Sequence, residues 1–115
     1  MSAESLVRKS LSTEFGQVFR ERTLQVGIAL DGYPALKSFD AVSEDVKIIA
    51  MVKEYSAENL AGNQTRHARV MRDLYFLSLC PAERKFLYLT APFYEWFKNQ
   101  RDAAVAPCIE IRLIR

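Results

Sequence analysis

Two residues that could do chemistry together, Asp40 and Lys53, lie on either side of a short polar segment. Asp40 falls in a strand-like stretch over residues 35–42, and Lys53 falls in a second stretch over residues 47–55. The three residues 43–45 between them, Ser-Glu-Asp, favour a turn. We therefore predict a β-hairpin that carries an acid on its first strand and a base on its second.

The register of this hairpin decides whether the two side chains can meet. If residues 43–46 form the turn, Asp40 lies opposite Ile49. Directly opposed residues share a face of a sheet, and side chains on one strand repeat every second residue. In this register one face therefore carries Asp40, Ile49, Met51 and Lys53. A slip of one residue would separate them, and the alternative is that both charged groups lie at strand ends and reach water.

The pattern FDAVSED followed by KIIAMVK resembles the core of the restriction-endonuclease-like superfamily, the PD-(D/E)xK nucleases. The order of the expected elements fits that family over roughly residues 12–115. In the family an aspartate on one strand and an acid-x-lysine on the next hold a divalent metal ion and activate water. Asp40 matches the first acid and Lys53 matches the lysine, but Met51 stands where the second acid belongs.

The resemblance implies a metal-dependent nuclease site. Asp40 would be a metal ligand, and Lys53 would position the attacking water or stabilise developing charge. In the family the first helix often contributes a glutamate, so Glu14 is expected as a third catalytic residue and second metal ligand, with Glu21 as an alternative. Mg²⁺ or Mn²⁺ is the expected ion, because these ions prefer oxygen ligands.

Two alternatives to this site stay open. Both glutamates could simply be solvated acids on a helix surface. The thioether of Met51 cannot replace a carboxylate as a ligand of a hard cation, so whether the protein is an enzyme is left undecided.

The segment before the hairpin, residues 2–28, is predicted to form a helix. Its apolar residues fall near one helical stripe, as expected for a helix that lies on a sheet; they are Leu11, Phe15, Val18 and Val26. The sequence Asp-Gly-Tyr-Pro at residues 31–34 should end this helix, because glycine and proline interrupt helices.

A second helix is predicted from about residue 64 to residue 79. Arg66, Arg69 and Arg72 follow one side of it at intervals of three. Such a ridge could track a phosphate backbone, since phosphate contacts position a protein on nucleic acid. The alternative is an ordinary solvated face. His67 has no acid or cysteine at ligand spacing and is expected to have a packing or surface role.

The last third of the chain is predicted to form a strand, a short helix and a strand, over residues 84–90, 93–101 and 108–115. The short helix carries four aromatic residues, which typically anchor a helix to its own core or to a second subunit. The final strand alternates between apolar and charged residues, and its edge could pair with a second copy. A homodimer through Phe93–Phe97 or through this strand is therefore a possible assembly.

Composition fits one domain, residues 1–115, with a formal net charge of +2. This charge permits a basic patch and does not demand nucleic acid. Because the sequence has no long apolar run and no apolar signal segment after Met1, we expect a cytoplasmic protein without a membrane partner. Cys80 and Cys108 lack the CxxC spacing of a structural zinc site.

We therefore predict an α/β fold with a small mixed β-sheet flanked by helices, in the order α-β-β-(β)-α-β-α-β of a restriction-endonuclease-like core. The expected function is that of a degenerate or divergent nuclease-like protein that acts on or binds nucleic acid, most simply DNA. A catalytically inactive relative would depend on its basic residues, which include Arg84 and Lys85, rather than on Asp40. The remaining alternative is a small homodimeric interaction or accessory protein with no nucleic-acid role.

Overall fold

The computed structural model describes residues 2–55 and 60–114, with the side chains of residues 60 and 61 left out of the description. Its elements follow the predicted order and form a mixed α/β fold. They are α1 (Ala3–Phe15), β1 (Phe19–Ile28), β2 (Pro34–Ser43), β3 (Ile48–Lys53), α2 (Leu60–Leu79), β4 (Arg84–Thr90), α3 (Ala91–Phe97) and β5 (Ile109–Ile114).

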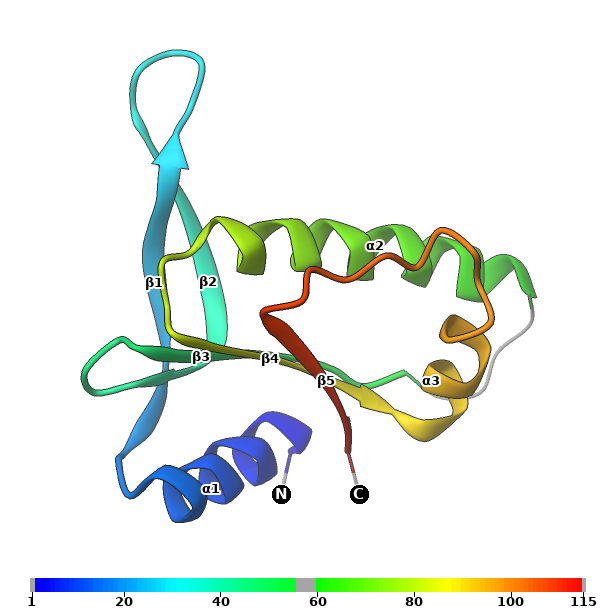
Figure 1. Ribbon diagram of the computed structural model, residues 1–115, viewed down its shortest axis with the longest axis horizontal. Helices are drawn as coiled ribbons and strands as arrows, with labels where there is room; N and C mark the ends of the chain where they lie inside the picture. The colour runs from blue at the N-terminus through cyan, green and yellow to red at the C-terminus, as the bar shows by residue number, and fades with distance from the viewer. Residues whose placement is uncertain (1, 56–59, 115) are drawn as a thin grey trace.

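The five strands form one sheet in their chain order, from β1 to β5. The pairs β1–β2 and β2–β3 are antiparallel, whereas β3–β4 and β4–β5 are parallel. The parallel pairs require crossovers, which α2 and α3 provide. Figure 1 shows α1 on one side of the sheet and α2 on the other.

The prediction of a single helix over residues 2–28 is wrong in its second half. The helix α1 ends at Phe15, where Gly16 adopts the left-handed conformation at φ +68° and donates its N–H to the carbonyl of Ser12. Residues 19–28 then form β1, although only four of its ten residues are of the β-branched or aromatic types that favour strands. Pairing of β1 with β2 outweighs the helical spacing of its apolar residues, because local propensity is weak against tertiary contacts.

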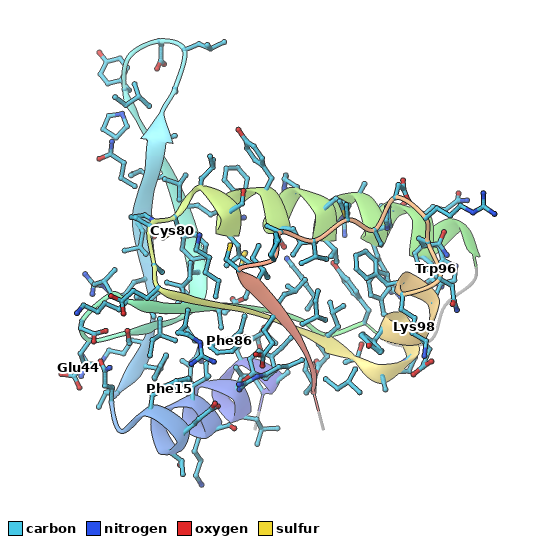
Figure 2. All side chains as sticks on the ribbon, in the orientation of Figure 1. Phe15, Glu44, Cys80, Phe86, Trp96 and Lys98 are labelled. Carbon is cyan, nitrogen blue, oxygen red and sulfur yellow. The ribbon has the colours of Figure 1, made fainter. Side chains whose placement is uncertain are left out.

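The core consists of two apolar clusters, one on each face of the sheet. Alternate residues of β3 supply both: Ile49 and Met51 face α2 and α3, while Ala50 and Val52 face α1. The unbroken apolar run of β3 was expected to be covered on both faces, and this is confirmed. Figure 2 shows the separation, with Phe86 on the α1 side of the sheet and Trp96, a residue of α3, on the α2 side.

The strands β1 and β2 continue beyond the body as a hairpin, which we call the arm (Figure 1). Residues 29–33, which include three of the four residues of the predicted breaker, form its turn, with Gly32 at φ +86° and the N–H of Tyr33 donated to Asp31. The tip exposes four large apolar side chains, more than 60 % accessible in each case: Ile28, Leu30, Tyr33 and Leu36.

The outer strand of the arm is irregular. Gln25 pairs with Leu36 and Gly27 pairs with Ala35, so that Val26 is an extra residue on β1. The side chain of Gln25 donates to the carbonyl of Gly27 at 3.1 Å. This bulge and its side-chain hydrogen bond occupy part of the free edge of β1.

The C-terminal elements agree with prediction apart from their ends. The strand expected at 84–90 is β4 with the same bounds, and the short helix is α3, which stops at Phe97. Phe93 and Phe97 of α3 are buried in the core of their own chain. In the described part of the chain, no helix combines the length and apolar character needed to cross a bilayer.

Candidate functional site at the junction of β2 and β3

A bulge in β2 sets the environment of Asp40. Arg20 pairs with Val42, and Arg22 pairs with Phe39, so Asp40 and Ala41 together stand opposite the single residue 21 of β1. A bulge of this kind bends the strand and re-aims a side chain. The regular ladder between β2 and β3 ends at the same place, at Ala41.

Where this ladder ends, the carboxylate of Asp40 accepts a backbone hydrogen bond from β3. Its Oδ2 atom accepts the backbone N–H of Val52 at 2.7 Å, while its carbonyl accepts Nη1 of Arg8 at 2.8 Å. Partial burial raises the pKa of the Asp40 carboxyl above its ordinary value, and this effect exceeds the opposing influence of the Val52 N–H and of Lys53. Asp40 therefore ties α1, β2 and β3 together.

The predicted hairpin register is wrong. Val42 lies opposite Ile49, which would place Asp40 opposite Met51 rather than Ile49 if the ladder continued. The cause is a connection of the same length that is displaced by one residue, to residues 44–47, where the carboxylate of Asp45 accepts the Ser43 hydroxyl and the N–H of Lys47. This Asx-type turn begins the connection one residue later in β2 and delays the start of β3 until Ile48.

Lys53 forms its closest ion pair with α2. Its Nζ atom lies 2.6 Å from Oδ2 of Asp73, and Nζ of Lys37 lies 3.5 Å from Oδ1 of the same residue. Asp73 is fully buried, whereas the two lysine side chains are 24 % and 21 % exposed. The contacts are ion pairs without the alignment of good hydrogen bonds. The positive charge of Lys53 is also close enough to Asp40 to act against the effect of burial and lower the pKa of the Asp40 carboxyl.

The partnership with Asp73 was missed in the sequence, although a signal was present. Asp73 lies three residues after Val70 and four before Leu77, both of which are fully buried on α2. Residues at these spacings share one face of a helix. An acid on the apolar face of a helix needs a buried cation, because burying an unpaired charge is very costly.

The two glutamates considered for the site are in different surroundings. Glu14 makes a two-pronged ion pair with Arg112 of β5, at 2.6 and 3.0 Å, and this contact lowers the pKa of the Glu14 carboxyl. Glu21 lies opposite the bulge, and its charge helps to raise the pKa of Asp40. The structure thus brings Glu21 rather than Glu14 into the neighbourhood of Asp40.

The side chains at this junction do not fit the divalent-metal site that the resemblance implies. Met51 is 3 % exposed within the apolar cluster. Within residues 2–55 and 62–114, no three side chains among His, Cys, Asp and Glu gather in a way that could hold a metal ion. Of the two expected ligands, Asp40 binds the β3 backbone and Glu14 binds Arg112.

Of the basic residues singled out in the sequence, some are exposed and others contact neighbouring side chains or backbone. On α2, Arg69 and Arg72 are exposed, but Arg66 lies over the ring of Tyr55 at 4.7 Å. Lys85 is buried and donates to the carbonyl of Ser78, and Arg84 covers the ring of Phe86.

His67 packs between α2 and α3, in agreement with the packing role expected for it. Its ring contacts Trp96 and Phe97, with centroids 5.9 and 5.3 Å away, and its Nε2 atom lies 3.3 Å from Asp102. The histidine therefore contributes to the aromatic contact between the two helices.

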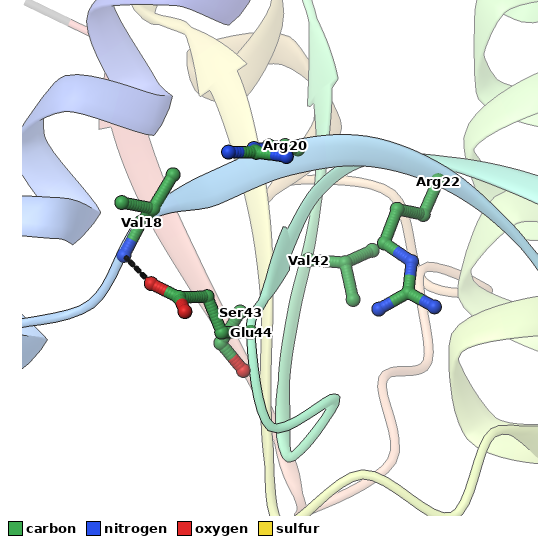
Figure 3. Close-up of a pocket in the computed structure, with 6 residues that line it drawn as sticks. All are labelled: Val18, Arg20, Arg22, Val42, Ser43 and Glu44. Atoms are coloured by element: carbon green, nitrogen blue, oxygen red, sulfur yellow. Dashed lines mark hydrogen bonds between the residues drawn. The ribbon is translucent and has the colours of Figure 1, made fainter.

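A cavity of about 330 Å³ opens beside the root of the arm (Figure 3). It is lined by Val18, Arg20, Arg22, Val42, Ser43 and Glu44. Figure 3 shows both arginines, which come from β1, around the same space as the end of β2. The sequence did not point to this cavity, because the arginines were placed in a helix.

Comparison of the chain with protein-family models, with curated proteins and with solved structures found no match. The relationship to PD-(D/E)xK nucleases therefore stays a prediction from the sequence.

Proposed function

We propose that this protein is a divergent relative of the PD-(D/E)xK nucleases that binds nucleic acid through its phosphates and does not cleave it. The order of helices and strands supports the proposal, because it agrees with the order expected from the resemblance. A cytoplasmic location, expected from the sequence, is part of the same proposal.

The proposal depends mainly on how the charged side chains are divided between internal contacts and the surface. Lys53 is paired with buried Asp73, and Glu14 is paired with Arg112. In contrast, two pairs of arginines, on β1 and on α2, are exposed, and no hydrogen bond or ion pair engages them in the part of the chain that the structure describes. They are Arg20 and Arg22 on β1 and Arg69 and Arg72 on α2.

Exposed guanidinium groups are well suited to phosphate. The planar fork of arginine matches two phosphate oxygens, and its positive charge is present at all physiological pH values. Phosphate contacts of this kind supply affinity without reading sequence. Binding by this protein should therefore depend steeply on salt and little on base sequence.

Cleavage is not expected, because the groups that would have to act together are engaged separately. The Asp40 carboxylate holds the β3 backbone, and the position of the second acid is filled by the buried thioether of Met51. Mg²⁺ or Mn²⁺ would be needed only if the protein cleaved nucleic acid.

The test is a binding and cleavage assay with fluorescein-labelled single-stranded and double-stranded DNA and RNA. We expect binding at low salt that weakens as salt rises, with a logarithmic slope of about 0.9 for each phosphate contacted in a duplex. No product should form with Mg²⁺ or Mn²⁺. Cleavage that Asp40→Ala abolishes would show a working catalytic site, and failure to bind any of these nucleic acids at low salt would overturn the proposal.

Met51→Asp, which restores the second acid of the family pattern, needs a folding control in this assay. An aspartate at this buried position would lie in the apolar cluster with Ile49 and Leu87. Its circular dichroism spectrum and unfolding midpoint must therefore be compared with those of the wild type before a lack of cleavage is interpreted.

A homodimeric accessory protein is the second candidate, and the exposed apolar tip of the arm favours it. Monomeric proteins rarely leave four large apolar side chains together in water. Sedimentation velocity would detect a concentration-dependent dimer, and Leu30→Ser combined with Tyr33→Ser should disperse it. A monomer at all concentrations would exclude this candidate.

A further inference from the structure

The cavity at the root of the arm combines two exposed arginines with a pocket that is open to solvent on one side. Arg20 and Arg22 are two residues apart on β1, so their side chains leave the same face of the strand, with Cα atoms roughly 7 Å apart. Both are exposed. Neither guanidinium has a hydrogen bond or ion pair to another described residue, whereas that of Arg112 is held by Glu14 and Glu110.

The negative charge beside these arginines is only partly available to them. Glu44 lines the cavity, but its Oε1 atom accepts the backbone N–H of Val18 at 3.2 Å (Figure 3). It makes no ion pair with either arginine in the described structure. Glu21 lies between the two arginines in the sequence and therefore projects from the opposite face of β1.

The remaining walls suit a small anion. Val42 is 1 % exposed and forms an apolar wall, and the hydroxyl of Ser43 is already engaged with Asp45 and the N–H of Ile48. The two arginines are thus left as the groups that can bind a ligand.

We propose that Arg20 and Arg22 form a phosphate-binding site at the root of the arm. The inference deepens the proposed function and depends on it where the phosphate belongs to nucleic acid. Free phosphate or pyrophosphate offers the same chemistry. In either case each guanidinium donates two N–H groups to phosphate oxygens, in the fork geometry that arginine favours.

The other exposed arginine pair differs from this one. Arg69 and Arg72 are exposed on α2, but neither lines any of four cavities found among the described residues. A second cavity, of about 260 Å³ beside α3, has walls of aromatic and aliphatic side chains with a single cation, Lys98, which is paired with Glu95. These arginines on α2 therefore serve as a charge-matched control.

The experiment compares Arg20→Gln/Arg22→Gln with Arg69→Gln/Arg72→Gln, since both double variants lose two positive charges. Fluorescence anisotropy with labelled DNA is measured over a range of salt concentrations. We expect the β1 variant to lose about tenfold or more in affinity and about two units of salt slope. The α2 variant loses the same charge from arginines that line none of the four cavities, so it should lose clearly less affinity than the β1 variant. Glu44→Gln, which keeps an acceptor for Val18, should tighten binding several-fold.

A titration with inorganic pyrophosphate separates this inference from the proposed function. The arginine Nε–Hε signals of Arg20 and Arg22 are followed by nuclear magnetic resonance, with the Arg69 and Arg72 signals as an internal control. Saturable shifts confined to the β1 arginines support the site even if DNA does not bind. If DNA binds but the β1 variant matches the wild type, the inference fails and the proposed function stands. If DNA binding does not depend on Arg20 and Arg22 and pyrophosphate does not shift their signals, the site is ruled out.

Discussion

Asp40 lies where partial burial and hydrogen bonding act in opposite directions on one carboxyl group. Burial disfavours the charged form, whereas the N–H of Val52 favours it, and burial has the larger effect. The folded state consequently holds the Asp40 proton more tightly than the unfolded state. A group of this kind stabilises the fold below its unfolded pKa, and this contribution is lost as pH rises through the folded pKa.

Asp40→Asn should reveal this linkage. The amide oxygen can still accept the N–H of Val52, but it cannot ionise. As pH rises from about 4 to 7, the free energy of unfolding of the wild type should therefore fall relative to that of the variant. Urea unfolding at several pH values measures the difference, and a relative gain by the wild type over this range would contradict the raised pKa.

The two lysines around Asp73 should differ in their importance for stability. Removing one partner of a buried ion pair leaves an uncompensated charge, which costs about 3 kcal/mol. Lys53→Met removes the ammonium at 2.6 Å and should approach this cost, whereas Lys37→Met removes the one at 3.5 Å and should cost about 1 kcal/mol. Urea unfolding of both variants checks the order, and equal losses would mean that Asp73 is shared evenly.

The residues at this site show what the sequence could and could not predict. Asp40 and Lys53 were correctly placed on neighbouring strands, because turn residues and apolar runs are local signals. Their partners were not found, because the bulge at Asp40 and the pairing with Asp73 depend on contacts between distant segments. Met51 was identified as the residue that departs from the family pattern; it is buried in the apolar core, and the relationship to that family stays a prediction.

At the scale of elements, the end of α1 decides the course of the following segment. Gly16 terminates the helix with φ at +68°, and three residues later the chain enters β1. Left-handed backbone is a conformation that most residues adopt only at an energetic cost. The sequence contained this stop signal, but the helical spacing of Phe15, Val18 and Val26 outweighed it in the prediction.

Gly16→Ala should destabilise the protein by about 1 kcal/mol, because alanine strains the left-handed conformation. Apart from its immediate chain neighbours, no atom lies within 4 Å of the added methyl group, so a clash does not contribute. Gly27→Ala is the matched control, since it also has open space but no positive φ, and it should be neutral. Urea midpoints compare the two, with Gly16→Asn expected to lie between Gly16→Ala and the wild type.

At the scale of the whole molecule, the sheet joins two apolar layers into one cooperative structure. Leu11 belongs to the α1 layer, and Leu77 belongs to the α2 layer; both are fully buried. The strands β3 and β4 contribute alternate residues to both layers. Loss of packing on one side should therefore weaken the other.

Trp96, the single tryptophan, provides a test of this coupling because it lies in the layer that does not contain Leu11. Leu11→Ala should lower the free energy of unfolding by about 3 kcal/mol. Trp96 fluorescence and far-ultraviolet circular dichroism should shift to the same new midpoint. If the fluorescence midpoint stayed unchanged while the helical signal moved, the two layers would unfold separately.

The two free edges of the sheet are not equivalent, and this limits how copies of the protein could polymerise. The edge formed by β1 is interrupted by the bulge at Val26 and by the side chain of Gln25, whereas β5 forms the opposite edge. Two copies joined through β5 would leave only interrupted β1 edges outside. Growth by strand addition would then stop at two copies, so the difference between the two edges would prevent the protein from forming fibres in this way.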